Sequence, residues 1–214
     1  MKRILIVDDH PLVRKGFTQL IEDEPGLEIC GEAADESESL QQVMATSPDL
    51  VIIDLSLAGG SGLNLIERIK AHHGNICMLV VSMHDEALFA ERVLTAGALG
   101  YLNKQEAPGN IINAIHRVLD GKVYLSDELK ERLLDSPAGS VKEPGQPPLQ
   151  QLSNRELEVF ELIGRGMMTG KIAEHLNLSI KTIETHRENI KIKLHLASGQ
   201  ELTRRAIYWL MERG

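Results

Sequence analysis

Short apolar runs alternate with longer amphipathic stretches over the first 120 residues of the chain. The runs consist mainly of aliphatic and β-branched side chains, which are typical of buried strands, and they span residues 4–7, 27–30, 50–53, 76–81 and 99–102. Each run is followed by a stretch of helical length, so that the chain repeats a strand–helix unit five times. This pattern predicts an α/β fold with a five-stranded, parallel, doubly wound sheet.

The stretches between the runs carry signals for the beginnings and ends of helices. Pro11 suits a first helical turn, and the next helices would begin at Asp35, at Ser61 or Gly62, and at Asp85. Gly97 and Gly121 stand where two helices would end. In the helix after Asp35, the spacing predicts that Leu40, Val43 and Met44 face inward.

Polar side chains follow four of the predicted strands. Asp8 and Asp9 come after the first run, Asp54 after the third, Ser82 after the fourth and Lys104 shortly after the fifth. Because parallel strands open on one edge of the sheet, these groups should converge there. Each group alone would be an ordinary turn or capping residue. Together, three carboxylates, a hydroxyl and an ammonium predict a site for a divalent cation and a phosphoryl group.

Oxygen ligands of this kind indicate Mg²⁺. We expect Asp8 and Asp9 to hold the ion or its water shell, Asp54 to bind it directly, and the backbone carbonyl of Ser56 to be a further ligand. Asp54 could then attack phosphorus to form an acyl phosphate. Ser82 would donate a hydrogen bond to one phosphoryl oxygen and Lys104 would pair with another.

The last third of the chain has the pattern of a small all-helical domain. Ser153 and Glu156 form a capping-box signature, and further helices are expected over 169–176, from Ser179 to about Leu194, and over 200–212. A short helix from Ser126 to Leu134 and a stretch rich in proline and glycine over 135–148 precede this domain. We therefore expect a first domain at 1–121, a helix and linker at 122–150, and an all-α domain at 151–214.

The formal charge of −8 is divided unevenly. Residues 151–214 hold 10 Lys and Arg and 8 Asp and Glu, a net +2, whereas residues 1–150 hold 13 and 23, a net −10. The split suggests different partners for the two parts, although +2 alone is weak support for nucleic acid. The sequence has neither an apolar run of membrane-spanning length nor a signal-peptide layout, so we expect a cytoplasmic protein without a membrane partner.

The first 120 residues resemble the receiver domain of two-component response regulators, through Val7-Asp8-Asp9-His10, Asp54-Leu55, Ser82 and Gly100-Tyr101-Leu102-Asn103-Lys104. The resemblance implies that Asp54 accepts phosphate from a sensor histidine kinase, that Ser82 shifts towards the phosphate, and that Tyr101 swings inward. His10 and His84 are interpreted as surface or capping residues, although His84 could approach the phosphoryl group from its loop.

Residues 150–213 resemble the LuxR-type DNA-binding domain, and the combination resembles the NarL/FixJ class of response regulators. The resemblance is carried by Leu152-Ser153-x-Arg155-Glu156, Ile172-Ala173-x-x-Leu176 and Ser179-x-x-Thr182-Ile183-x-x-His186. It implies that the helix from Ser179 enters the major groove and that a homodimer binds paired half-sites. Contacts with base edges or nearby phosphates are expected from Lys181, Thr182, Glu184, Thr185 and Glu188. Phosphate contacts are expected from Lys171, Arg187, Lys191 and Lys193.

These features together predict a phosphorylation-controlled transcription regulator that is not a turnover enzyme. One alternative is a receiver-type regulator that works without phosphate. A second is a Mg²⁺-dependent phosphohydrolase with Asp54 as nucleophile. Such an enzyme would need a second carboxylate two residues further on, where this chain has Ser56.

Overall fold

The structure is a computed structural model that describes residues 1–57, 60–127, 129–131 and 149–211. Its contacts divide the chain into two compact units, Met1–Ala138 and Gly139–Gly214. Each unit is considered by itself below.

The first unit is built on a parallel sheet. Its strands lie in the order β2-β1-β3-β6-β7, and every neighbouring pair runs parallel. Their bounds are β1 Lys2–Val7, β2 Leu27–Ala33, β3 Leu50–Ile53, β6 Cys77–Ser82 and β7 Gly100–Asn103. The predicted five-stranded, doubly wound sheet is therefore confirmed.

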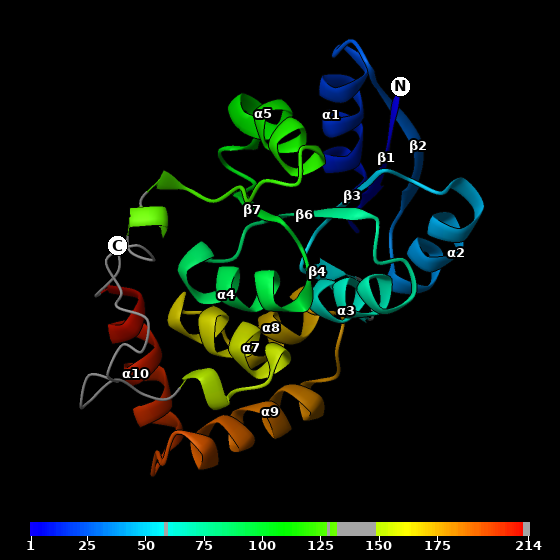
Figure 1. Ribbon diagram of the computed structural model, residues 1–214. Helices are drawn as coiled ribbons and strands as arrows, with labels where there is room; N and C mark the ends of the chain where they lie inside the picture. The colour runs from blue at the N-terminus through cyan, green and yellow to red at the C-terminus, as the bar shows by residue number, and fades with distance from the viewer. Residues whose placement is uncertain (58–59, 128, 132–148, 212–214) are drawn as a thin grey trace. The chain divides into compact units, whose positions relative to one another are not determined.

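Helices cover both faces of this sheet (Figure 1). On one face lie α1 (Pro11–Glu22) and α5 (Ala107–Leu119), and on the other lie α2 (Glu36–Thr46), α3 (Gly62–His72) and α4 (Glu86–Ala96). With helices on both sides, the central strands are buried throughout, which explains why their sequences are continuously apolar rather than alternating. Aliphatic side chains of β1, β3 and β6 pack with Phe17 and Ile21 of α1 and with Ile111, Ile115 and Val118 of α5.

The predicted helix signals match the observed helix ends, with one error in the inward positions. Pro11 opens α1, the Asp35 side chain accepts a 2.8 Å hydrogen bond from the Glu38 N–H, and Gly97 ends α4 in the left-handed conformation. Val43 faces the core as expected. Met44 does not, because its side chain is 72% exposed on the outer surface of α2.

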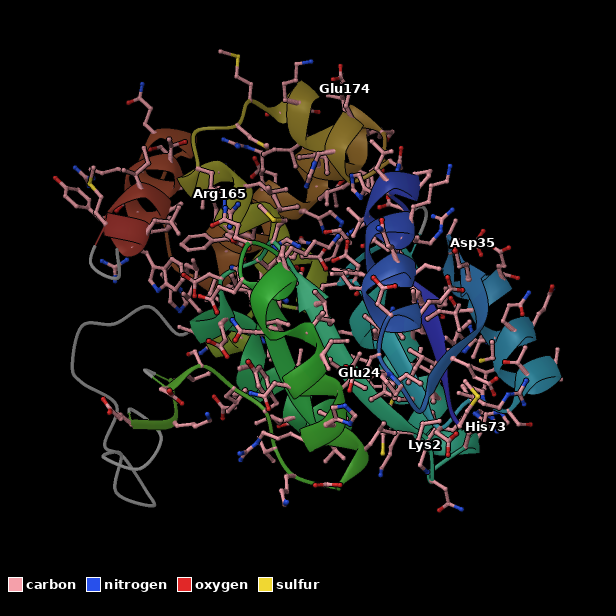
Figure 2. All side chains as sticks on the ribbon, turned by 90° about the horizontal axis from the view of Figure 1, so that it is seen from above. Lys2, Glu24, Asp35, His73, Arg165 and Glu174 are labelled. Carbon is pink, nitrogen blue, oxygen red and sulfur yellow. The ribbon has the colours of Figure 1, made fainter. Side chains whose placement is uncertain are left out.

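Parallel strands give the first unit two chemically different ends. Lys2, at the start of β1, and His73, shortly before β6, lie at one end, whereas Asp35, which follows β2, lies towards the other (Figure 2). The residues that follow β1, β3, β6 and β7 belong to this second end.

A second, two-stranded sheet lies directly after β3 and was not predicted. Here β4 (Ser56–Leu57) pairs antiparallel with β5 (Gly60–Ser61), and α3 begins immediately afterwards. The Gly62 N–H donates a 2.9 Å hydrogen bond to the Leu55 carbonyl. The backbone passes so close here that a β-carbon at Gly62 would overlap the Asp54 carbonyl oxygen and lie 2.7 Å from the Leu55 α-carbon.

The chain after α5 binds along the outer edge of β7. The Tyr124 N–H donates to the Leu99 carbonyl, and the Tyr101 N–H donates to the Tyr124 carbonyl, each at 2.9 Å. The Ser126 N–H donates to the Glu86 carboxylate at 2.9 Å, and the Ser126 hydroxyl accepts from the Leu129 N–H as the predicted cap. Residues 127 and 129–131 are helical; the rest of the helix predicted to Leu134, and the predicted linker at 135–148, lie outside the described residues.

The second unit is helical, as predicted. After a short 3₁₀ turn at Leu149–Gln151 it contains α7 (Asn154–Gly164), α8 (Thr169–His175), α9 (Ile180–Lys193) and α10 (Gly199–Met211). Ser153 and Glu156 form the predicted capping box, and Ser179 caps α9. Trp209 of α10 packs edge-on against Phe160 of α7, with ring centroids 6.3 Å apart. Across the described part of both units, no helix has the length and apolar character needed to cross a membrane.

Candidate functional site

Three side chains from separate strand ends meet in a buried acidic pocket. The Lys104 Nζ lies 2.7 Å from an Asp8 carboxylate oxygen and 2.7 Å from an Asp54 carboxylate oxygen. Asp8 and Asp54 are 2% and 3% exposed, so this triad is almost closed to solvent. Asp8, Asp54 and Lys104 therefore converge at one edge of the sheet, as expected for residues that follow parallel strands.

Backbone hydrogen bonds between neighbouring strands fix the positions of the triad. The Asp54 N–H donates to the Val7 carbonyl at 2.9 Å, and the Lys104 N–H donates to the Ser82 carbonyl at 2.9 Å. Arg14 of α1 adds a side-chain anchor, since its guanidinium donates to the Asp8 carbonyl at 2.6 Å. The sheet thus positions the functional groups without relying on the loops alone.

Burial and neighbouring charges raise the pKa values of two triad members, Asp54 and Lys104. Burial raises the pKa of Asp54 above its ordinary value, the negative charge of Asp8 raises it further, and Lys104 offsets part of both effects. Burial alone would lower the pKa of Lys104, but the carboxylates of Asp54 and Asp8 outweigh it and hold that pKa above the ordinary value. Lys104 is therefore a permanent cation at neutral pH, and added positive charge would favour ionised Asp54.

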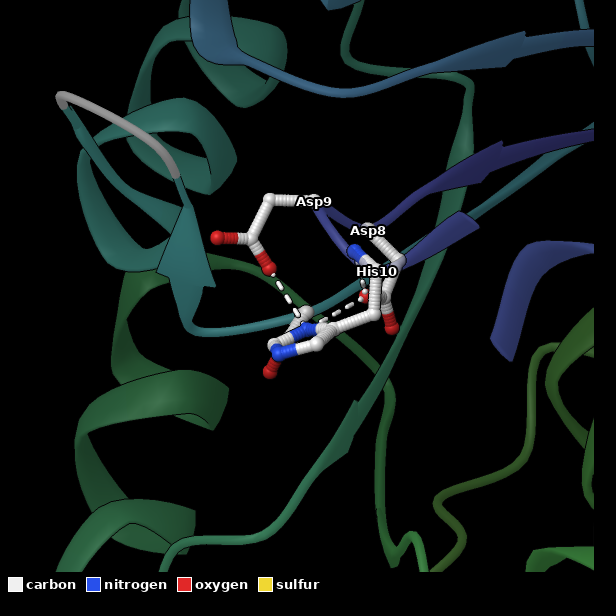
Figure 3. Close-up of side chains that lie close together, drawn as sticks. Asp8, Asp9 and His10 are labelled. Carbon is white, nitrogen blue, oxygen red and sulfur yellow. Dashed lines mark hydrogen bonds and ion pairs between the residues drawn. The ribbon is translucent and has the colours of Figure 1, made fainter. Parts of the chain in front are cut away.

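Asp9 and His10 lie next to Asp8, with the His10 ring between the two carboxylates (Figure 3). The His10 Nδ1 lies 2.7 Å from an Asp9 carboxylate oxygen and 3.3 Å from Asp8 Oδ1, and its backbone N–H donates to Asp8 Oδ1 at 2.8 Å. His10 remains exposed, as the sequence interpretation expected. Its contact with both carboxylates was missed, because a histidine after two aspartates has no distinctive spacing.

The pocket has the donor set of a cation site. Asp8, Asp9, His10 and Asp54 each offer one ligand atom, and these atoms lie within 4.8 Å of one another. Within the described residues, the buried Asp54 Oδ1 has no hydrogen-bond partner. A buried carboxylate oxygen without a partner is costly unless a cation or an incoming group satisfies it, and its oxygen-rich surroundings fit Mg²⁺. The backbone carbonyl of Ser56 remains a predicted ligand.

His84, which follows β6, contacts the short strand β4 that follows β3. It is 4% exposed, its Nε2 lies 2.8 Å from the Ser56 hydroxyl, and its ring packs 4.9 Å from the ring of Phe89. The buried Tyr101 hydroxyl donates to the His84 carbonyl at 2.8 Å, and Ser82 is buried at the end of β6. The interpretation of His84 as a surface residue is therefore wrong, and Tyr101 occupies an inward position.

The second unit presents a helix-turn-helix. The turn between α8 and α9 is formed by Asn177, which has a left-handed backbone, with Leu178 and Ser179. Ile183 and Ile190 are buried beneath α9. Thr182 is half-buried and bonds to the Ser179 hydroxyl, while the outer face of α9 exposes Lys181, Glu184, Thr185 and Glu188.

Three other basic residues of the predicted DNA surface have carboxylate partners within the domain. Lys193 pairs with Glu156 at 2.6 Å, Lys191 with Glu188 at 2.8 Å, and Lys171 with Glu174 at 2.8 Å. Arg187 is half-buried and lines a groove against α10, together with Gly199, Thr203, Arg204 and Tyr208. Among the predicted lysines, Lys181 alone forms no ion pair with any residue that the structure describes.

Comparison with known proteins matches both units to families. Residues 4–116 match the response regulator receiver domain, and residues 150–206 match the bacterial regulatory proteins of the luxR family. Response regulator UvrY of Escherichia coli O6:H1 is 33% identical over 207 residues, which cover 97% of this chain and 94% of UvrY. Transcriptional activator protein ExaE of Pseudomonas putida is 38% identical over 209 residues, which cover 95% of each chain.

The same architecture occurs in a solved structure of RcsB from Salmonella enterica serovar Typhimurium, bound to the promoter rprA in the presence of the phosphomimetic BeF3-. That chain is 26% identical with a TM-score of 0.64, and the match covers 96% of this chain and 98% of RcsB. The two family matches follow each other along nearly the whole chain, and together they assign the protein to a family. The chain belongs to the two-component response regulators of the NarL/FixJ class, which join a receiver domain to a LuxR-type helix-turn-helix domain.

Proposed function

We propose that this response regulator accepts a phosphoryl group on Asp54 from a sensor histidine kinase and thereby changes its binding to promoter DNA. The observation that carries the proposal is the position of Asp54, which lies beside Lys104 and Asp8 and has one unpartnered buried oxygen. The protein would act in the cytoplasm, and no turnover enzyme is expected. A phosphohydrolase is not favoured, because Ser56 stands where its second carboxylate would be.

In the proposed reaction, an Asp54 carboxylate oxygen attacks phosphorus of the kinase phosphohistidine. The acyl phosphate bond forms as the P–N bond breaks, and the histidine nitrogen keeps the electron pair. Lys104 neutralises one phosphoryl oxygen, and the Ser82 hydroxyl donates to another. Asp8, Asp9 and Asp54, with the Ser56 carbonyl, would hold magnesium, whose positive charge would stabilise the phosphoryl oxygens. In this scheme, a movement of Ser82 would be transmitted towards α4 through the hydrogen bonds that His84 makes with Ser82 and Tyr101.

The proposed output is DNA binding through α9 in the major groove, by a homodimer on paired half-sites. Lys181, Thr182, Glu184, Thr185 and Glu188 would contact base edges or nearby phosphates, and Glu can accept from cytosine N4. Lys171, Arg187, Lys191 and Lys193 would contact phosphates, and the paired lysines would first exchange their carboxylate partners for phosphate. A phosphorylation-dependent change requires the phosphoryl group to have different free energies in the two receiver states.

The proposal is tested by the Asp54→Asn variant. Treatment with acetyl phosphate and Mg²⁺ should add one phosphoryl group to the wild type, seen by intact-mass spectrometry, and should change its affinity for promoter fragments selected by genomic footprinting. The variant should gain no phosphoryl group and show no change in affinity. An equal response of variant and wild type would show that Asp54 is not the acceptor.

A second prediction concerns Lys181 on the exposed face of α9. We expect Lys181→Ala to weaken binding to all DNA sequences similarly and to reduce the slope of log K against log salt concentration by about 1, since one phosphate contact is lost. The measurement is a fluorescence-anisotropy titration at several salt concentrations. As control, Lys122→Ala removes an exposed lysine from the receiver, and its salt slope should equal that of the wild type. A loss confined to one DNA sequence would instead indicate base contact.

A further inference from the structure

We infer that His10 gives the acidic pocket a second metal specificity: the pocket binds a divalent transition ion such as Zn²⁺ through the His10 imidazole and the carboxylates of Asp8, Asp9 and Asp54. Bound in this way, the ion keeps Asp54 from accepting phosphate. The inference rests on the proposed function, because it concerns the same pocket. It adds an ion class, a ligand and an inhibitory role.

The arrangement of oxygen atoms in the pocket leaves one side open towards His10. Lys104 occupies the Oδ2 oxygens of Asp8 and Asp54. The remaining oxygen of Asp54 has no hydrogen-bond partner within the described residues, and Asp8 Oδ1 faces the His10 backbone and ring. Lys104 and His10 therefore contact different oxygens of Asp8, and the second oxygen of Asp54 is not bound by Lys104. A cation on the His10 side need not displace Lys104.

His10 is placed to move onto such an ion. Its Nδ1 already lies 2.7 Å from Asp9 and 3.3 Å from Asp8, and its side chain is 59% exposed and so has room to rotate. The four ligand atoms lie within 4.8 Å of one another. A tetrahedral zinc site with ligand distances of about 2 Å places its ligand atoms about 3.3 Å apart, so the widest pair must approach by roughly 1.5 Å. The exposed imidazole can rotate as the set contracts.

The ligand preference of each ion decides whether His10 strengthens its binding. Magnesium prefers oxygen and keeps several waters, so an imidazole adds little to its binding. Zinc binds imidazole well and is usually satisfied by four ligands. If all four come from Asp8, Asp9, His10 and Asp54, no position is left for a phosphoryl oxygen, and the Asp54 oxygen that would attack is itself coordinated. Zinc should therefore inhibit where magnesium assists.

The test compares metal affinities of the full-length wild type and His10→Ala. Zinc and magnesium are titrated separately in competition with a chromophoric chelator. We expect His10→Ala to weaken zinc binding by about tenfold or more, and magnesium binding by less than about threefold. His116→Ala is the matched control, because His116 is a surface histidine 3.1 Å from the single carboxylate of Glu24; it should change neither affinity.

A spectroscopic measurement identifies the ligand directly. Cu²⁺, a paramagnetic transition ion that like zinc binds imidazole well, should show nitrogen modulation in electron spin-echo spectra when bound to the wild type, and this signal should disappear in His10→Ala and persist in His116→Ala. If His10 only orders the carboxylates by hydrogen bonding, the two affinities will fall by the same factor and no nitrogen signal will be lost. Either result would overturn the inference.

The inhibitory role has its own measurement. With Mg²⁺ and acetyl phosphate present, added zinc should block phosphorylation of the wild type at concentrations that leave His10→Ala largely phosphorylated. Failure of the proposed function is distinguishable, since the wild type would then take no phosphate even without zinc. Equal zinc sensitivity of the two proteins would refute the inhibitory role.

Discussion

Replacing Gly62 with alanine should strongly destabilise the receiver domain and leave the helix-turn-helix domain folded. The added β-carbon would overlap the Asp54 carbonyl oxygen and lie 2.9 Å from the Asp54 carbonyl carbon, and neither backbone atom can rotate away. Overpacking of this kind typically costs about 1–3 kcal/mol and sometimes more. Because the clash is with Asp54 itself, phosphate acceptance should fall even in molecules that remain folded.

Scanning calorimetry combined with tryptophan fluorescence can separate the two domains. The single tryptophan, Trp209, is buried against Phe160 and reports only on the helix-turn-helix domain. Gly62→Ala should lower the receiver transition and leave the fluorescence transition unchanged. Gly16→Ala, in α1 with nothing within 4 Å of the added carbon, should stabilise the receiver by about 0.5–1 kcal/mol.

A reciprocal control lies in the other domain. At Gly164, an added β-carbon would lie 2.7 Å from the Ala206 carbonyl oxygen of α10, so Gly164→Ala should lower the fluorescence transition only. If Gly62→Ala unfolds at the wild-type temperature and accepts phosphate normally, the close approach of α3 to Asp54 is not a constraint on this fold.

Replacing Lys104 with methionine should destabilise the receiver by an amount that grows as pH rises. The substitution leaves Asp8 and Asp54 buried without their cation, and removing one partner of a buried pair costs about 3–5 kcal/mol when the other stays charged. The pKa of Asp54, already raised by burial and by Asp8, loses the opposing effect of Lys104 and rises further.

The direction of the pH dependence follows from the two states of Asp54. In the unfolded chain Asp54 ionises near its ordinary pKa, whereas in the folded variant it ionises only at higher pH. Folding stability is therefore lost progressively as pH rises from about 4 towards the folded-state pKa. In the wild type the raised pKa of Lys104 contributes stability that is fully present at neutral pH and is lost only under strongly alkaline conditions.

Urea denaturation of the two proteins between about pH 4 and pH 7 measures this difference. The gap in unfolding free energy should be small at the acidic end and largest at neutral pH. Lys122→Met serves as control, because Lys122 and its partner Asp120 are both more than half exposed, so its effect should stay within about 0.5 kcal/mol at every pH. A gap that is constant with pH would mean that lost packing, rather than charge, is responsible.

The central part of the pocket could be predicted from the sequence because it depends on topology. Once the apolar runs are parallel strands, Asp8, Asp54 and Lys104 must follow strand ends on one edge, and the order β2-β1-β3-β6-β7 puts those strands close together. The caps at Asp35, Ser153 and Ser179 could be predicted for a similar reason, since each depends on a side chain and a backbone N–H that are three residues apart.

Contacts set by tertiary packing could not be predicted. The bond between His84 and Ser56 joins two residues that are 28 positions apart, and no local pattern pairs a histidine with a serine. The two-residue strands β4 and β5 are too short to show any periodicity. The pairing of Lys193 with Glu156 likewise depends on how α9 packs against α7, and the exposure of Met44 depends on how α2 sits on the sheet.

The hydrogen bonds of Tyr124 to Leu99 and Tyr101 limit how receivers of this kind can associate. A bare border strand invites another chain to extend the sheet by backbone pairing. At β7 the protein's own polypeptide already occupies the Leu99 carbonyl and the Tyr101 amide, so strand addition by a second molecule is blocked at these positions. We therefore expect any self-assembly on this flank to depend on side-chain recognition, which is more readily reversed than continuous β-pairing.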